Sequence, residues 1–250
     1  MPANSVYILT SRAINERTQL DQIANNVANL NTAGYKAGDT TFREYVAREK
    51  GLEVGSFNRF GGNIINFQGG PIEHTGNKLD MALQGENTFF AVQGAGGEGA
   101  PVEYTRNGQF TMDAQGNLMT QTGKMVLDVN NGPIALPPDS TQIAISRDGT
   151  VSNEDGPIAQ VGVFEFAPED LSSLQRTEGS SFTKPDDVLA IVAENYAIVQ
   201  GSLETSNVNP MSETVRMTEA LRAYQSVQRS MQAVEDIEQR SYRTLGRMPQ

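Results

Sequence analysis

The N-terminal segment carries apolar side chains at the spacing of a helical heptad. Positions that repeat every seven residues in this a/d pattern lie on one stripe of an α-helix. The segment therefore predicts an amphipathic helix of about 28 residues, roughly 40 Å long. Glu16 interrupts its apolar stripe once. The predicted helix seam is formed by Val6, Leu9, Leu20, Ile23, Val27 and Leu30, with Ala13 between them.

The C-terminal segment repeats this pattern over a longer stretch. After Pro210, a residue suited to the first turn of a helix, no Gly or Pro follows until Gly246. This segment predicts a second helix of about 36 residues, roughly 55 Å long. With an apolar seam on each, the two terminal helices are expected to pair as an antiparallel coiled coil. The seam of the second helix consists of Met217, Ala220, Tyr224, Val227, Met231 and Val234.

Between the predicted helices, short apolar runs alternate with turn dipeptides such as Asn107-Gly108 and Asp155-Gly156. This alternation is typical of antiparallel sheets. By contrast, residues 37–79 are rich in Gly, Asn and Phe without a clear period, so we expect an extended, partly ordered connector there. The predicted strand-like runs are residues 88–93, 109–112, 117–120, 125–129, 142–146 and 159–166.

The predicted fold class is α+β with a mainly β body. Residues 1–36 and 202–250 form a terminal helical assembly domain, residues 37–79 the connector, and residues 80–201 a β-rich central domain. A pair of helices buries little core of its own, so its exposed apolar stripes need partners. The chain is therefore expected to complete its fold on assembly.

Composition narrows the chemistry that the chain can perform. It has no Cys and a single His, which excludes disulfides, thiolate metal sites and thiol nucleophiles. The net charge of −11 is concentrated at residues 37–201, which hold 10 basic and 22 acidic residues. This acidic body argues against binding nucleic acid or anionic membrane surfaces. We also expect no membrane insertion, because no apolar run approaches ~20 residues. We expect no cleaved signal peptide, because residues 1–5 do not begin a basic segment followed by an apolar one.

Three features resemble ligand or catalytic sites, but each lacks an element or a residue that such a site requires. The glycines at residues 94–99 match a dinucleotide-binding pattern, yet a strand-like run follows where a helix N-terminus would be needed. Asp113 and Asp128 begin turns that lack the spaced acidic residues of a calcium loop. His74 stands beside Glu73 without an identifiable nucleophile. We therefore expect no catalytic residue, no cofactor and no metal.

Two other classes of protein stay open on these residues alone. One is a secreted β protein that binds carbohydrate or calcium and has coiled-coil ends. The other is a β-rich hydrolase that uses paired carboxylates such as Glu103 and Asp113.

Several motifs, in order along nearly the whole chain, resemble those of the bacterial flagellar rod and hook proteins. The N-terminal signature stands at residues 24–36 (ANNVANLNTAGYK), and its C-terminal counterpart at residues 201–210 (GSLETSNVNP) precedes Arg222-Ala223-Tyr224. Lys78 and Thr88 depart from the residues that are common at their positions. Internal matches stand at residues 75–80, 89–92 and 104–110.

The resemblance implies a structural role. Members of this family are exported through the flagellar type III export apparatus without a cleaved signal peptide. They stack helically, with copies of themselves and with other flagellar rod subunits, into the rod of the basal body in the periplasm, which transmits torque. The length and compact middle of this chain are most similar to proximal-rod (F-type) subunits, with distal-rod (G-type) subunits as the alternative.

The expected assembly interface lies in and beside the two signatures. Asn is a poor helix former, so the amides near the end of the first helix are expected to form hydrogen bonds across subunits. Gly34 is expected to end this helix in the left-handed conformation. Asn207 and Asn209 are expected as turn or cap residues, with a contact to a neighbouring subunit as the alternative. The interface set is Asn25, Asn26, Asn29, Asn31, Gly34, Tyr35, Asn207, Asn209, Met217, Tyr224 and Met231.

Overall fold

The computed structural model describes residues 2–49, 52–94, 100–137 and 143–245 of the chain. It divides the chain into two compact units, each described here by itself. The helical unit consists of Met1–Ala28, Gly38–Ile65 and Asn209–Gln250, and the β unit of Asn29–Ala37 and Asn66–Val208. The chain thus passes between the units four times.

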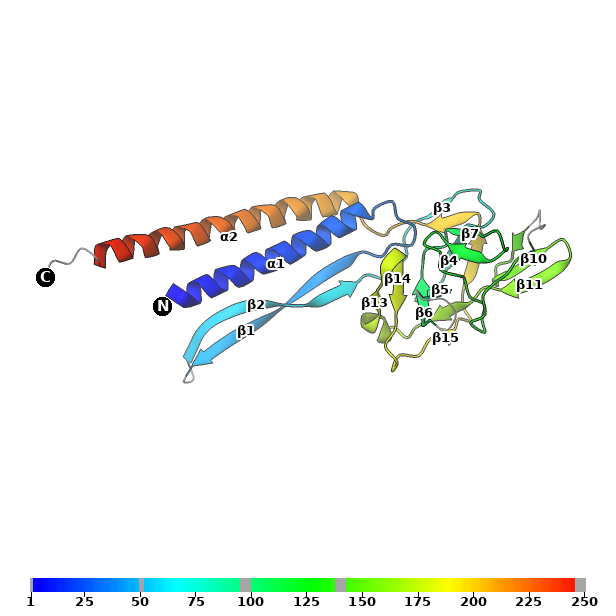
Figure 1. The fold of residues 1–250 in the computed structure, drawn as a ribbon, viewed down its shortest axis with the longest axis horizontal. Helices are drawn as coiled ribbons and strands as arrows, with labels where there is room; N and C mark the ends of the chain where they lie inside the picture. Colours follow the sequence, from blue (N-terminus) through cyan, green and yellow to red (C-terminus); the bar gives the residue numbers. More distant parts are fainter. Residues whose placement is uncertain (1, 50–51, 95–99, 138–142, 246–250) are drawn as a thin grey trace. The chain divides into compact units, whose positions relative to one another are not determined.

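The helical unit contains the two terminal helices. Helix α1 (Pro2–Ala28) and helix α2 (Pro210–Leu245) run antiparallel beside each other, and α1 also packs against the two strands of this unit (Figure 1). In the predicted seams, Ile23, Ala220 and Val227 are buried, whereas Val6 is 38% exposed. Within the described residues, neither helix combines the length and the apolar character that crossing a membrane requires.

Strands β1 (Gly38–Glu49) and β2 (Leu52–Ile65) form a long antiparallel hairpin. The expectation of a connector at residues 37–79 therefore needs correction, because much of that range has regular structure. The strands escaped detection because glycines interrupt them and because the register shifts between Thr41 and Phe42. Such a bulge breaks the strict apolar–polar alternation by which strands are recognised.

The β unit is built from short antiparallel strands. Its largest sheet has the order β13-β14-β6-β5-β12-β15, and smaller sheets pair β3 with β17, β4 with β16, β7 with β8, and β10 with both β9 and β11. The strands are β3 (Ile72–His74), β4 (Met81–Gln84), β5 (Thr88–Gln93), β6 (Val102–Thr105), β7 (Phe110–Met112), β8 (Leu118–Thr120), β9 (Ala144–Ile145), β10 (Thr150–Asn153), β11 (Gly156–Gln160), β12 (Val163–Glu165), β13 (Gln175–Arg176), β14 (Ser181–Thr183), β15 (Ile191–Val192), β16 (Ala197–Gln200) and β17 (Ser202–Glu204). Two short 3-10 helices, η1 (Asp170–Ser173) and η2 (Glu178–Ser180), lie between β12 and β14.

The mainly β body with one helix at each end confirms the predicted fold class at this level. The predicted run at residues 88–93 coincides with β5, and the run at 117–120 contains β8. The run at 125–129 forms isolated bridges, such as Val126 with Val92, in place of a strand.

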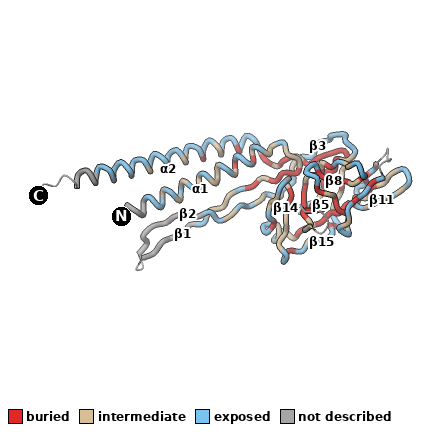
Figure 2. The backbone as a smooth tube through the Cα atoms, in the orientation of Figure 1, coloured by how far each residue is buried: buried red, intermediate tan, exposed pale blue. Residues whose placement is uncertain are grey.

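Strand β5 lies at the centre of the core, buried on both faces (Figure 2). Successive side chains of a strand point to opposite faces, so Phe89 and Phe90 enter different layers. Phe90 joins an apolar cluster with residues such as Leu118 and Val163. On the other face, the Phe89 ring lies edge-on to Phe166 and to Phe182, with centroids 5.6 and 5.9 Å away.

The last strands of the β unit pair with its first ones. Strand β16 lies against β4 and β17 against β3, with Ser202 opposite His74. The Gly34 N–H donates to the Glu204 carbonyl at 2.7 Å, which attaches residues 29–37 to the same unit. The β unit is thus wider than the central domain expected at residues 80–201.

Candidate assembly site

In the helical unit, Asn26 joins both helices and the base of the hairpin. It is 1% exposed. Asn26 Nδ2 donates to the Gly38 carbonyl at 2.8 Å and to Glu213 Oε2 at 3.3 Å, and Oδ1 accepts the Gly38 N–H at 3.0 Å. The amide thereby satisfies both backbone groups of Gly38. A Cβ at Gly38 would lie 2.5 Å from Gln22 Nε2, so a larger residue there would require the Gln22 side chain to move.

Glu213 extends this contact to a second charged group. It is 5% exposed, and its Oε1 accepts from Arg216 Nη1 at 3.1 Å. Arg216 Nη2 in turn donates to Asp39 Oδ1 at 2.7 Å. Because a buried carboxylate is costly unless it is paired, these contacts fix α2 to the start of β1. We call Asn26, Gly38, Asp39, Glu213 and Arg216 the helix-base node.

Away from their buried stripes, both helices carry exposed apolar side chains. Tyr7 and Ile14 on α1 are 78% and 57% exposed. Met211, Val215 and Ile237 on α2 are 75%, 53% and 66% exposed. Single exposed apolar residues are common, but Tyr7 and Ile14 stand seven residues apart and share one face of their helix. This face can pack against another protein surface.

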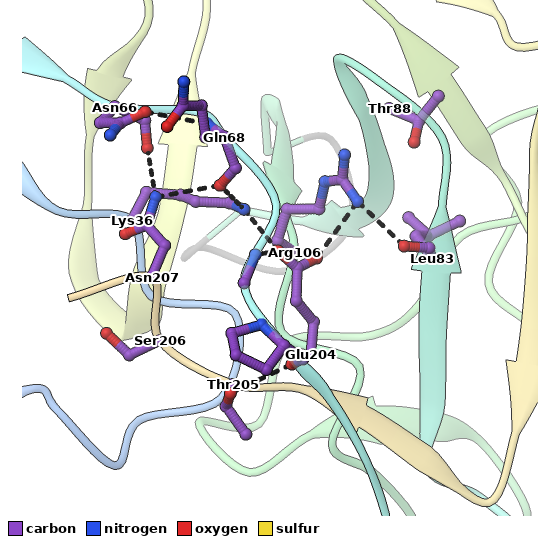
Figure 3. Close-up of polar contacts among 12 residues, drawn as sticks. Lys36, Asn66, Gln68, Leu83, Thr88, Arg106, Glu204, Thr205, Ser206 and Asn207 are labelled. Carbon is purple, nitrogen blue, oxygen red and sulfur yellow. Dashed lines mark hydrogen bonds and ion pairs between the residues drawn. The ribbon is translucent and has the colours of Figure 1, made fainter. Parts of the chain in front are cut away.

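In the β unit, Lys36, Arg106 and Glu204 form a buried charged cluster (Figure 3). Their side chains are 0%, 3% and 2% exposed. Lys36 Nζ donates to Glu204 Oε1 at 2.5 Å, and Arg106 Nη1 to Glu204 Oε2 at 3.2 Å. The Gly70 N–H also donates to Glu204 Oε1, at 2.8 Å. The single carboxylate thus holds two cations and one backbone amide.

The two cations of the cluster also bond to backbone carbonyls. Lys36 Nζ donates to the carbonyl of Gln68 at 2.8 Å, and Arg106 donates to those of Leu83 and Gly85 at 3.1 and 2.5 Å. Burial lowers the pKa of Lys36 and of Arg106, and the nearby Glu204 carboxylate raises both in part compensation. Removing the carboxylate would leave two buried cations uncompensated.

Gly34 and Asn207 bring backbone segments together around this cluster. Gly34 has a φ of +65°, and a Cβ there would lie 2.3 Å from the Arg106 carbonyl carbon. Asn207 Nδ2 donates to the carbonyls of Asn66 and Gln68, each at 2.9 Å, and its Oδ1 accepts the Ala37 N–H at 2.7 Å. Three separate segments of the chain therefore meet through these side chains.

The chain is similar over its whole length to curated flagellar proteins. It is 34% identical to the flagellar basal-body rod protein FlgF of Caulobacter vibrioides, over 98% of this chain and 99% of that protein. The chain belongs to the flagellar basal-body rod protein family. This rod protein is also 30% identical to FlgF of Mesorhizobium japonicum, over 97% of the chain and 98% of that protein. It is 32% identical to FlgG of Bacillus subtilis, over 89% of this chain and 91% of that protein.

Three family models match separate parts of the rod protein. Residues 6–36 match the flagella basal body rod protein model, residues 82–153 the flagellar hook protein FlgE/F/G D1 domain, and residues 199–244 the C-terminal model of the flagellar basal body rod FlgEFG proteins. The relatives are structural flagellar rod proteins, not enzymes. The chain is accordingly a structural rod subunit of the bacterial flagellum.

The structure gives several residues of the predicted interface a role inside the rod protein itself. Asn26 belongs to the helix-base node, and Asn207 closes the charged cluster. Asn209 caps α2, because its Oδ1 accepts the N–H groups of Met211 and Ser212 at 3.0 and 3.3 Å. These contacts explain the residue types without a neighbouring subunit.

Two expectations near the end of the first helix need correction. Gly34 adopts the left-handed conformation, but α1 already ends at Ala28, so Gly34 does not terminate the helix. Tyr35 is 3% exposed, and the Arg176 guanidinium lies 4.4 Å above its ring. The Tyr35 ring is therefore covered within the chain and does not form an open surface.

The remaining interface candidates fall into two groups. Asn25 and Asn31 are exposed, and Asn29 is partly buried with its Oδ1 accepting from Thr32 Oγ1 at 3.1 Å. Three residues of the α2 seam are partly buried along the stripe that includes Ala220 and Val227. They are Met217, Tyr224 and Met231.

Sequence reasoning missed the charged residues that organise both units. Lys36, Arg106 and Glu204 each lie inside a motif that carried the family resemblance, at residues 24–36, 104–110 and 201–210. A charge inside each of three motifs was a signal that they meet. For Glu213 we find no comparable signal.

The residues considered for an enzyme or metal site form hydrogen bonds within the protein. Glu103 Oε2 accepts from Lys124 Nζ at 2.6 Å. Asp113 accepts hydrogen bonds within its own turn, of which the bond from the Asn117 side chain contributes most to lowering the Asp113 pKa. In the described part of the chain, no group of three or more His, Asp or Glu side chains is placed to hold a metal ion. Of the glycines at residues 94–99, all but Gly94 lie outside the described residues.

Proposed function

We propose that this chain is a proximal-rod subunit that polymerises helically through its terminal helices. The polymer contains copies of the chain and other rod subunits, and forms the torque-transmitting shaft of the basal body in the periplasm. The observation that carries this proposal is that both helices expose large apolar side chains, Tyr7 and Ile14 on α1 and Met211 and Val215 on α2. Burying such side chains is worth about 1.5–3 kcal/mol each, and a neighbouring subunit supplies the cover.

The two helices of one subunit pair as an antiparallel coiled coil in this proposal. Support comes from the burial pattern, in which Ile23, Ala220 and Val227 are buried and Leu20 and Val27 partly buried. These positions follow the heptad spacing. The exposed amide of Asn25 on α1 then lies beside the seam, and that of Asn31 is exposed in the β unit. In this proposal both amides bond to a neighbouring subunit.

The proximal position is supported by the FlgF relatives, which cover nearly the whole chain. A distal-rod subunit is the second candidate, because FlgG of Bacillus subtilis is 32% identical over 89% of the chain. Export through the flagellar type III apparatus without a cleaved signal peptide belongs to the same proposal and is supported by the family alone.

The proposal is tested by removing the apolar face of α1. In a strain that lacks its own copy of the gene, the variant Tyr7→Ser/Ile14→Ser should be excluded from isolated basal bodies and fail to restore swimming. Losing two buried side chains weakens each interface by about 3 kcal/mol or more. The matched control is Ile72→Ser, which removes an exposed apolar side chain from the β unit.

Both purified proteins should melt like the unchanged chain when followed by circular dichroism, because all three side chains are exposed. Normal incorporation of the double variant would contradict the proposal. Equal loss of incorporation in the Ile72→Ser control would also contradict it, because the effect would then not be specific to the helices.

A further inference from the structure

The β unit exposes one continuous apolar run. Leu189, Ile191 and Val192 are 73%, 63% and 46% exposed. The residues on either side, Val188 and Ala193, are 2% and 6% exposed and belong to the core. The run is therefore held in place at both ends while its large side chains face outward.

The backbone of this run forms the free edge of the six-stranded sheet. Among the described strands, β15 is the last in the order and pairs with β12 alone (Figure 1). The Ala193 N–H donates to the Val163 carbonyl at 3.0 Å. Antiparallel pairs alternate between bonded and non-bonded positions, so Val192, opposite Phe164, directs its N–H and C=O away from β12. Outward backbone groups with exposed apolar side chains form a template for an added strand.

The charges around this edge are mainly acidic. Asp186 and Asp187 precede the run and Glu194 follows it, all three exposed. Glu165 on β12 adds a carboxylate beside β15. Lys184 is the basic residue near this end, and its ammonium group donates to the Val188 carbonyl at 2.8 Å. A strand laid along the edge would meet negative charge at both of its ends.

We propose that the β15 edge, residues 188–193, binds an extended apolar segment of a different protein that carries Lys or Arg at its ends. The segment adds to the sheet as a further strand through backbone hydrogen bonds, and the acidic flanks select its charged ends. This surface lies between the family-model matches at residues 82–153 and 199–244. The proposal does not depend on the role given to the helices.

A second copy of the chain is a poor occupant of this edge. The run has Asp186 and Asp187 at one end and Glu194 at the other. When two such runs overlap fully, antiparallel or parallel, carboxylates of one copy lie beside carboxylates of the other. Like charges facing each other across a strand pair are destabilising, so the edge favours a partner of opposite charge.

The test uses the full chain and short fluorescent peptides of alternating Val and Thr. One peptide has Lys at both ends and a second has Glu. A third has the Lys ends but carries N-methyl groups on the amides that would donate to the outward carbonyls of β15. Binding is measured by fluorescence anisotropy for the unchanged chain, for Ile191→Ser/Val192→Ser, for Asp186→Lys/Asp187→Lys/Glu194→Lys, and for Ile72→Ser as the control.

The Lys-ended peptide should bind the unchanged chain and the Ile72→Ser control about tenfold or more tighter than the Glu-ended peptide. The charge-reversed variant should invert this preference. The N-methylated peptide should not bind the unchanged chain, and the Lys-ended peptide should not bind Ile191→Ser/Val192→Ser. Absence of binding, binding that ignores N-methylation, or an unchanged preference after charge reversal would overturn the proposal. Self-association of the chain that disappears in Ile191→Ser/Val192→Ser would overturn it in favour of a second copy.

Discussion

The two units of this rod protein differ in how much buried apolar core each one contains. In the β unit, the largest fully buried side chains include Lys36 as well as Phe89 and Phe182. In the helical unit, Tyr7 and Ile14 stay more than half exposed on α1. The β unit has enough core and enough hydrogen bonds to compensate for its buried lysine. The described part of the helical unit buries few apolar side chains, namely Ile23, Ala220 and Val227.

This difference separates self-sufficient folding from folding that needs a partner. The β unit encloses its core between sheets and fastens its first and last segments with Glu204. The helical unit has the buried helix-base node around Asn26 and a long pair of helices beyond it. We therefore expect the β unit to resist denaturation alone, and the helices to gain most of their stability from neighbouring subunits.

The largest expected effect comes from removing the carboxylate of the charged cluster. Glu204→Gln leaves Lys36 and Arg106 buried without a counter-charge, which should lower the free energy of unfolding of the β unit by about 3–5 kcal/mol. Urea denaturation followed by circular dichroism measures the loss. The control is Glu73→Gln, opposite Leu203 in the same strand pair but exposed, with an expected change within about 0.5 kcal/mol. Equal stability of the two variants would show that the cluster does not hold the unit closed.

A smaller effect is expected from Asn26 in the helical unit. Asn26→Leu leaves the N–H and C=O of Gly38 and one oxygen of Glu213 without their partner, at a cost of about 1–3 kcal/mol. Hydrogen exchange should show faster exchange in α1 and β1 and unchanged protection in the β unit. The variant should also enter rods poorly. Gln225→Leu, which removes an exposed amide from α2, should leave the exchange rates unchanged.

Slower exchange in the helices of Asn26→Leu would contradict the comparison, because the polar node would then not stabilise this unit. Loss of protection in the β unit would also contradict it, because the two units would then not differ in how they are stabilised.

The helices and many strands could be predicted because local patterns determine them. A heptad seam requires only that apolar residues such as Leu20 and Val227 recur along one segment. Dipeptides such as Asn107-Gly108 likewise mark turns whatever the rest of the chain does. The hairpin of β1 and β2 lacked such a pattern, since its bulge and its glycines break the alternation.

The candidate site could be predicted only in part, because its key contacts join residues far apart in the sequence. Glu204 meets Lys36 across 168 positions and Arg106 across 98. No local period reports such a pairing. The sequence did mark the segments that contain these residues, but it could not show that Asn26 and Asn207 bond within the chain. Their amides suit an intramolecular and an intersubunit contact equally well.

The smallest expected effect depends on pH and is confined to the β unit. The Tyr104 ring lies edge-on to Phe166, with centroids 4.8 Å apart, and burial raises the pKa of its hydroxyl. Above a pH of about 10, the unfolded chain loses this proton while the folded chain keeps it. The free energy of unfolding should therefore fall by at most about 1.4 kcal/mol per pH unit as the pH rises further. Tyr104→Phe should remove most of this slope in urea denaturation, leaving a part from Tyr196, whose pKa burial also raises. An identical slope in the variant would show that the phenol ionises freely, and hence that this face of the β unit is no more closed than the helices.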